Sequence, residues 1–164
     1  ASLLLQAGAC ASPAGQAGAS PLQLAAAGGH QRLAGLLLEA RADANAAEER
    51  GLTALMLAAQ AGHALCVDSL LASRAEADRE RSDGGSALML AAQGGHQPVL
   101  DRLLRARADV DLADVEGRGA LMYAVHYGHA AAATSLLGAG AAVDQADASG
   151  WSPLLLAVQG GHLA

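Results

Sequence analysis

A repeat of 33 residues constrains this chain more than any other feature of its sequence. Gly-His pairs recur at that constant spacing, and a second glycine recurs in phase with them, followed two residues later by Ser, Thr or once by Gly. Such a period indicates an array of stacked units rather than one closed core. The Gly-His pairs occupy positions 29–30, 62–63, 95–96, 128–129 and 161–162, and the second glycine occupies positions 18, 51, 84, 117 and 150.

One unit shows what the period encodes. Thr53 is placed to cap a short helix that ends near Gly62. After His63 an apolar stripe predicts a second helix, which is broken before Ala75, and the polar stretch that continues to Asp83 predicts a turn or hairpin. Two helices of about ten residues cannot hide an apolar face alone. Each pair must therefore stack on the next, with alanine allowing close approach.

The composition and charge of the chain exclude several classes of protein. The chain is 52% apolar and 16% charged, which predicts a folded protein rather than a disordered one. A formal net charge of -6 opposes binding to nucleic acid or to an anionic membrane. No apolar stretch is long enough for membrane insertion, the first residues lack the basic region of a signal peptide, and two cysteines make no disulfide framework. We therefore expect a cytoplasmic protein, with a nuclear location also possible.

The residues of one unit carry a family pattern. Residues 150–154 read Gly-Trp-Ser-Pro-Leu and residues 57–59 read Leu-Ala-Ala. With the recurring Gly-His and Leu-Leu pairs, they resemble the ankyrin repeat family over essentially all of the sequence. The resemblance implies an all-α fold, an ankyrin-repeat solenoid of stacked antiparallel helix pairs with projecting β-turn or hairpin loops. It also implies a role in binding other proteins.

The period divides the sequence into one array. Neither end resembles the polar cap that a solenoid needs, so we expect a piece of a longer ankyrin-repeat protein. The predicted units are a partial repeat at 1–17, full repeats at 18–50, 51–83, 84–116 and 117–149, and a partial repeat at 150–164.

Some positions depart from the family pattern. Gly119 replaces the capping hydroxyl. Where the family has a histidine in its first turn, this chain has Gln23, Met56, Met89, Met122 and Leu155, which predicts apolar packing in place of a polar network. Arginine stands at 41, 74 and 107, where the family prefers a left-handed glycine, and an acid follows two residues later at Asp43, Glu76 and Asp109. We expect these arginines and acids to form surface ion pairs.

The histidines and serines that recur with the period have structural explanations. Five histidines occur one per unit, and stacked helices lie ~8–10 Å apart, too far for zinc ligands that must approach within ~2.1 Å of one ion. The resemblance instead implies that these imidazoles bond to loop backbone between repeats. The serines at 20, 86 and 152 are explained as helix caps, and Cys66 falls in an apolar helix pattern. The sequence therefore predicts no catalytic residue, metal or cofactor, and the chain is not expected to be an enzyme.

By the resemblance, hairpin tips and the ends of the first helices line a concave binding face. There Arg118, His126, Tyr127 and Trp151 supply the residue types that dominate interface hot spots. The alternative is that Trp151 covers its neighbour, with Arg118 one repeat away, and that Tyr127 covers a helix end. Tyr123 is expected in the core, because leucine occupies its position in two other units. The predicted protein-binding residues are Glu49, Arg50, Leu52, Gln60, Ser82, Asp83, Gln93, Val115, Glu116, Arg118, His126, Tyr127, Ser149, Trp151 and Gln159.

The function that follows is a protein–protein interaction module that binds a partner protein through this face. The alternative is a regulatory or scaffolding segment of a larger enzyme, channel or ubiquitin-ligase subunit whose active part lies outside these residues. The resemblance also raises Asn45 as a substrate of an asparaginyl hydroxylase. The case rests on one residue, because the matching positions hold Asp78, Asp111 and Asp144.

Overall fold

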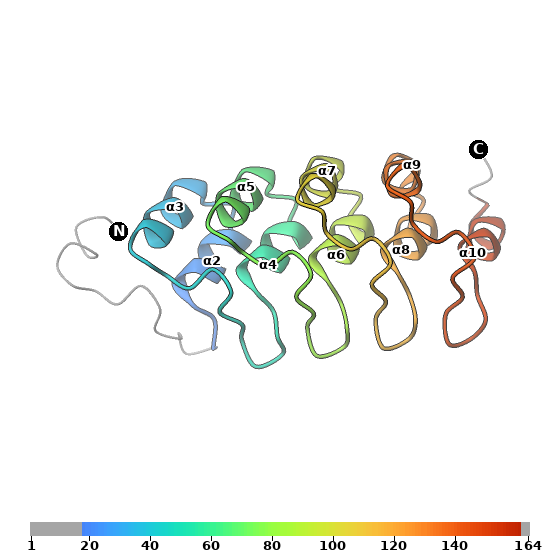
Figure 1. The fold of residues 1–164 in the computed structure, drawn as a ribbon, viewed down its shortest axis with the longest axis horizontal. Helices are drawn as coiled ribbons and strands as arrows, with labels where there is room; N and C mark the ends of the chain where they lie inside the picture. The colour runs from blue at the N-terminus through green and yellow to red at the C-terminus, as the bar shows by residue number, and fades with distance from the viewer. Residues whose placement is uncertain (1–17, 162–164) are drawn as a thin grey trace.

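A computed structural model describes residues 18–161 and shows an elongated array of helices in two layers (Figure 1). Loops project from the array on the side of the inner layer, between each outer helix and the next inner helix. The helices of the inner layer are α2 (Pro21–Ala27), α4 (Ala54–Gln60), α6 (Ala87–Gln93), α8 (Ala120–His126) and α10 (Pro153–Gly160). The helices of the outer layer are α3 (Gln31–Glu39), α5 (Ala64–Ala72), α7 (Gln97–Arg105) and α9 (Ala130–Gly138).

This arrangement confirms the predicted all-α solenoid. Successive inner helices start 33 residues apart, as do successive outer helices. Each of α2, α4, α6 and α8 packs against its own outer helix and against the next inner helix, and α10 packs against α8. Within the described residues, β structure is limited to isolated antiparallel bridges that close the loops, one of which joins Ala47 to Thr53. We call these loops hairpins 1 to 4, at residues 41–53, 74–86, 107–119 and 139–152.

The inner helices begin where the capping residues predict. The hydroxyl of Thr53 accepts a hydrogen bond from the backbone N–H of Met56 at 3.3 Å. Ser20 and Gln23 form a complete capping box around the first turn of α2. Gly119 precedes α8 without any side-chain cap, as its lack of a hydroxyl requires.

The recurring histidines join neighbouring units. Nε2 of His63 donates to the carbonyl of Ala27 at 3.1 Å, and His96 and His129 make the equivalent bonds to the unit before them at 2.9 and 3.0 Å. Because a carbonyl oxygen only accepts, Nε2 must carry the proton in each ring. A Cβ atom at Gly62 would lie 2.7 Å from Nδ1 of His96, so glycine is needed where the ring packs. These contacts confirm the predicted structural role for His63, His96 and His129, whereas His162 lies outside the described residues.

The core runs continuously through the array. Alanines such as Ala58 and Ala91 are fully buried between inner helices, and Leu70 and Leu103 are fully buried on the outer helices. Small residues let the inner helices approach closely, so that alanine supplies buried surface that larger residues supply in most cores. Cys66 lies in this core with a free thiol, and burial raises the pKa of that thiol.

The expected arginine ladder is wrong. Arg41, Arg74 and Arg107 do adopt left-handed backbone, with φ of 63°, 64° and 62°. However, the carboxylates that follow bond to backbone instead: Asp43 and Asp109 each accept a hydrogen bond from the N–H two residues further on, at 2.9 and 3.0 Å. Such a local hydrogen bond costs less side-chain conformational entropy than an exposed ion pair, which must also hold the long arginine side chain in place. The ion pairs among the described residues are Arg81–Asp83, Arg102–Asp68, Arg118–Asp114 and Arg118–Glu116.

The expected apolar packing in the first turn holds for three of the five units. Met56, Met89 and Met122 are buried. Gln23 contradicts the expectation, because its amide donates to the carbonyls of residues 46 and 52 at 3.2 and 2.7 Å and so keeps a polar network. Leu155 also contradicts it, since this residue of α10 is 49% exposed.

Among residues 18–161, every helix is too short to span a bilayer.

Candidate protein-binding surface

All of the predicted binding residues lie on the hairpins or near the ends of inner helices, and each is at least partly exposed. Neighbouring hairpins are held together by backbone hydrogen bonds. The N–H groups of Ser82, Val115 and Ala148 donate to the preceding hairpin at 2.9, 2.9 and 2.8 Å. We call the surface formed by hairpins 1 to 4 and the adjoining ends of the inner helices the inner surface. Its parts hold fixed positions relative to one another because the backbone bonds join them in series.

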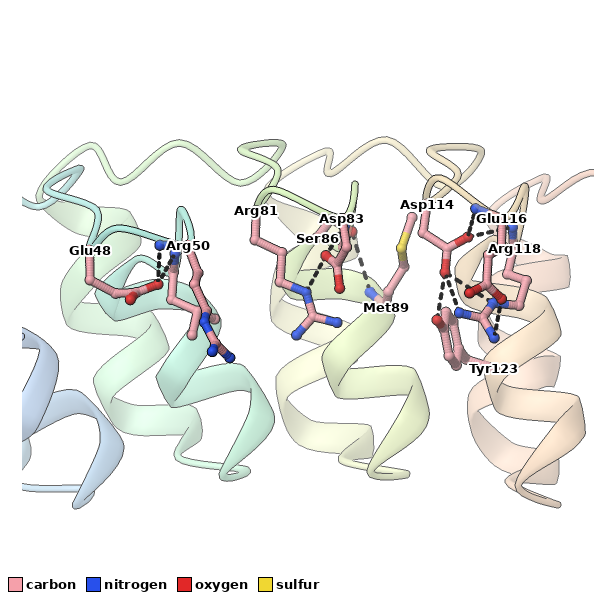
Figure 2. Close-up of polar contacts among 12 residues, drawn as sticks. Glu48, Arg50, Arg81, Asp83, Ser86, Met89, Asp114, Glu116, Arg118 and Tyr123 are labelled. Carbon is pink, nitrogen blue, oxygen red and sulfur yellow. Dashed lines mark hydrogen bonds and ion pairs between the residues drawn. The ribbon is translucent and has the colours of Figure 1, made fainter.

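Three of the four hairpins have a carboxylate at the same position of the repeat, where it bonds to the hairpin backbone. Glu48, Asp114 and Asp147 occupy matching positions in hairpins 1, 3 and 4, and one oxygen of each accepts hydrogen bonds from the backbone N–H groups two and four residues further on. Hairpin 2 has Arg81 at the matching position and uses Asp83 instead, which accepts from the N–H of Gly85 and pairs with Arg81 (Figure 2). These hydrogen bonds fix the backbone of each hairpin.

Hairpin 3 adds a cluster of side chains around Asp114. Figure 2 shows Arg118 and Tyr123 converging on this carboxylate. Nε of Arg118 and the phenol of Tyr123 both donate to Oδ2 of Asp114, at 3.0 and 2.6 Å. The guanidinium also pairs with Glu116 at 2.9 Å and lies 5.2 Å from the centroid of the Tyr123 ring, within reach of a cation–π interaction.

The cluster shifts the pKa values of its members. Burial opposes ionisation of Asp114, but the hydrogen bonds from Tyr123 and Arg118 outweigh it and lower the pKa of this carboxyl. Burial and the bond to the Asp114 carboxylate both raise the pKa of the Tyr123 phenol. The cluster is therefore an ionised carboxylate held by a guanidinium and a neutral phenol.

Two expectations about these aromatic residues need correction. Tyr123 is only partly buried: it packs against the core, its phenol donates to the buried carboxylate of Asp114, and its ring is covered by Arg118. The cation–π contact of Arg118 is with Tyr123, on its own unit, whereas the alternative from the sequence paired Arg118 with Trp151 one repeat away. The signal in the sequence was Tyr123, five residues after Arg118 and just inside the next helix. The spacing alone does not show their contact, because the contact depends on the geometry of the hairpin.

A cavity of about 270 Å³ opens on the inner surface between hairpins 3 and 4 and continues between helices α8 and α10. Its lining includes five of the predicted residues, Arg118, His126, Tyr127, Trp151 and Gln159. The sequence missed the other residues of the lining, which are Met122, Tyr123, Asp147 and Leu156. The match of Asp147 to Asp114, one period earlier, is the signal that could have found it.

Tyr127 is held in place by its neighbours. Its ring meets His126 edge to face at a centroid distance of 4.9 Å and stacks on His129 at 6.4 Å. Its hydroxyl accepts a hydrogen bond from Gln93 at 3.2 Å. Tyr127 is the C-cap residue of α8 and still exposes 49% of its surface, while Trp151 exposes 37%. Tyr127 thus covers a helix end and is also available to a partner.

The remaining predicted residues do not line this cavity. They follow the inner surface toward the N-terminal units or mark the tips of hairpins 3 and 4. These residues are Glu49, Arg50, Leu52, Gln60, Ser82, Asp83, Gln93, Val115, Glu116 and Ser149. Across residues 18–161, no three His, Cys, Asp or Glu side chains form a group that could hold a metal ion.

The paired layers, the hairpins and the histidine bonds define a helical repeat protein. A family model for ankyrin repeats (3 copies) matches residues 1–83, 22–114, 55–147 and 88–164, and the chain belongs to the ankyrin repeat family. Ankyrin repeats are generally protein–protein interaction modules and are typically non-catalytic. A comparison with curated proteins gave no match.

Proposed function

We propose that this chain binds a partner protein through its inner surface. The residues that repeat in every unit are used to hold units together, as the histidine bonds show. The residues that differ between units lie exposed on hairpins that are fixed to one another. A rigid surface of variable residues suits recognition, because little conformational entropy is lost on binding.

The cavity between hairpins 3 and 4 carries this proposal. Tyr123, Tyr127 and Trp151 all line it, and these are all the Tyr and Trp residues of the sequence. Aromatic side chains in a concave site dominate binding energy at protein interfaces. Their concentration in one cavity, on an array otherwise built from alanine and leucine, favours this place as the centre of the interface.

Affinity capture with the complete protein tests the proposal. Tyr127→Ala and Trp151→Ala are expected to weaken capture of a specific partner at least tenfold together. Leu65→Ala is the matched control, because Leu65 is similarly exposed but lies on outer helix α5. A partner that is retained by the double variant and lost with Leu65→Ala would place the interface on the outer layer.

A second candidate is that the array is a regulatory or scaffolding segment within a larger ankyrin-repeat protein, whose active part is an enzyme, channel or ubiquitin-ligase subunit. The observation that favours it is the apolar surface of α10, where Leu154 is 68% exposed while the matching Leu121 and Leu88 are buried by the following unit. A further repeat would bury Leu154 in the same way. A stable, monodisperse monomer of this chain in solution would count against this candidate.

A further inference from the structure

We propose that the cavity between hairpins 3 and 4 receives an arginine side chain of the partner, with Asp147 as its carboxylate and Trp151 as its aromatic platform. The inference rests on the proposed function and names the chemistry of the partner at this site.

Asp114 and Asp147 are one period apart and cap their hairpins through Oδ1 in the same way. Their second oxygens differ. Oδ2 of Asp114 accepts hydrogen bonds from Arg118 and Tyr123, whereas Oδ2 of Asp147 accepts none from any part of the chain that the structure describes. The difference follows from the sequence, because the positions that match Arg118 and Tyr123 hold Trp151 and Leu156. Asp147 therefore presents an open carboxylate oxygen to the cavity that it lines.

The cluster in hairpin 3 shows how a guanidinium sits against a carboxylate in this position. Arg118 bonds to Oδ2 of Asp114 and stacks on an aromatic ring at the same time. At Asp147 the chain supplies the carboxylate and aromatic rings, but no arginine of residues 18–161 pairs with that carboxylate, so an arginine from outside would complete the same arrangement. Arginine suits the site better than lysine, because its planar group stacks on rings while it donates to a carboxylate.

The charges around the cavity favour a cation. The guanidinium of Arg118, which also lines the cavity, is already paired with both Asp114 and Glu116 at 3.0 and 2.9 Å. It is therefore poorly placed to attract a partner carboxylate, and Asp147 adds a further negative charge. The whole chain is acidic, with a formal net charge of -6, which attracts a basic partner segment over longer range.

A peptide titration tests the inference directly, because Trp151 is the single tryptophan of the chain and reports on the site. The probe is the capped peptide acetyl-Gly-Gly-Arg-Gly-Gly-amide, added at constant ionic strength to the full chain. A ligand of this size should bind with a Kd on the order of 1 mM, so the titration runs to about 20 mM. We expect a saturable change in tryptophan fluorescence with arginine, a weaker one with lysine, and none with citrulline, which has the same shape without the charge.

Asp147→Asn is the sharpest variant. Asparagine keeps an oxygen to accept the two backbone N–H groups of hairpin 4, but it replaces the open acceptor with an N–H₂ donor. We expect it to raise the Kd for the arginine peptide about tenfold. Asp144→Asn removes the same charge from the same hairpin without touching the cavity, and should change the Kd by no more than about twofold.

Three results would overturn the inference. They are the absence of saturation with the arginine peptide, an equal response to citrulline, and equal effects of Asp147→Asn and Asp144→Asn. The proposed function fails separately, because it predicts loss of a captured partner in Tyr127→Ala and Trp151→Ala whatever the peptide does. Loss of that partner without any arginine response would leave the inner surface as the interface and reject arginine as its ligand here.

Discussion

The side chain of Asn45 in hairpin 1 accepts a hydrogen bond from the backbone N–H of Glu76 in hairpin 2, at 2.8 Å. Asp78 and Asp111, one and two periods later, each accept the equivalent bond from the following hairpin, also at 2.8 Å. Asn45 differs only in that its amide also donates to the carbonyl of Arg74 at 3.2 Å. One side-chain oxygen in each of hairpins 1 to 3 thus joins that hairpin to the following one.

This relationship predicts unequal effects of two changes at Asn45. Asn45→Ala removes the acceptor and should lower the free energy of unfolding by about 1 kcal/mol. Asn45→Asp keeps the acceptor that Asp78 and Asp111 use, and should lower the free energy of unfolding by less than about half as much as Asn45→Ala does. Urea unfolding followed by circular dichroism measures both. Equal losses for the two variants would show that the donor to Arg74, rather than the shared acceptor, stabilises this contact.

The left-handed arginines predict a stabilising substitution. Arg107 has φ of 62°, and the matching residue one period later is Gly140, with φ of 93°. Left-handed backbone costs a residue with a Cβ about 1 kcal/mol, and the extra freedom of glycine in the unfolded chain offsets part of that cost. We expect Arg107→Gly to raise the free energy of unfolding by about 0.5 kcal/mol, and Gly140→Arg to lower it.

Arg105→Gly is the control for this prediction. Arg105 is two residues earlier in the chain and ends helix α7, so glycine there should lower stability by up to about 1 kcal/mol. Both variants remove one exposed arginine, and only the backbone conformation differs. Thermal unfolding of the pair therefore separates backbone strain from charge. A loss of stability in both would mean that Arg107 is not strained.

The sequence predicted the features that depend on local spacing. The 33-residue period set the helix starts, and Ser20 and Thr53 cap their helices as expected because an N-cap acts on an N–H only three residues away. The histidine bonds also followed, since the family pattern implies them. Every one of these features repeats with the period, so one unit could be interpreted with the help of the others.

The sequence did not predict features that depend on where the hairpins place long side chains. The expected partners of Arg41 and Arg107 were wrong, because the carboxylates of Asp43 and Asp109 accept hydrogen bonds from backbone N–H groups two residues further on. Tyr123 was expected in the core, yet it is only partly buried, with its phenol bonded to the carboxylate of Asp114. Asp147 was missed because its importance lies in the absence of the side chains that surround its counterpart, and this becomes visible only when the two hairpins are compared.

The cluster around Asp114 makes stability depend on pH. Its carboxyl has a lowered pKa in the folded chain, so the stabilisation is fully present above the unfolded value near pH 4 and is lost as pH falls through the folded pKa. Asp114→Asn should therefore lower the free energy of unfolding by about 2 kcal/mol at pH 7. This difference from the wild type should disappear below about pH 4. Urea midpoints measured from pH 7 to pH 2.5 test this. A constant gap across that range would show that charge on Asp114 does not stabilise the fold.

Transplanting the cluster to hairpin 4 is the most demanding test of the comparison between the two aspartates. Trp151→Arg places a guanidinium four residues after Asp147, and Leu156→Tyr places a phenol where Tyr123 stands in the previous unit. If Oδ2 of Asp147 is an open acceptor, the two substitutions should stabilise the chain together by about 0.5–1 kcal/mol more than the sum of their separate effects. A double-mutant cycle in urea gives that coupling energy, and adding Asp147→Asn should abolish it. Zero coupling with intact Asp147 would mean that hairpin 4 does not present its carboxylate as hairpin 3 does, and that a guanidinium from a partner would find no equivalent site.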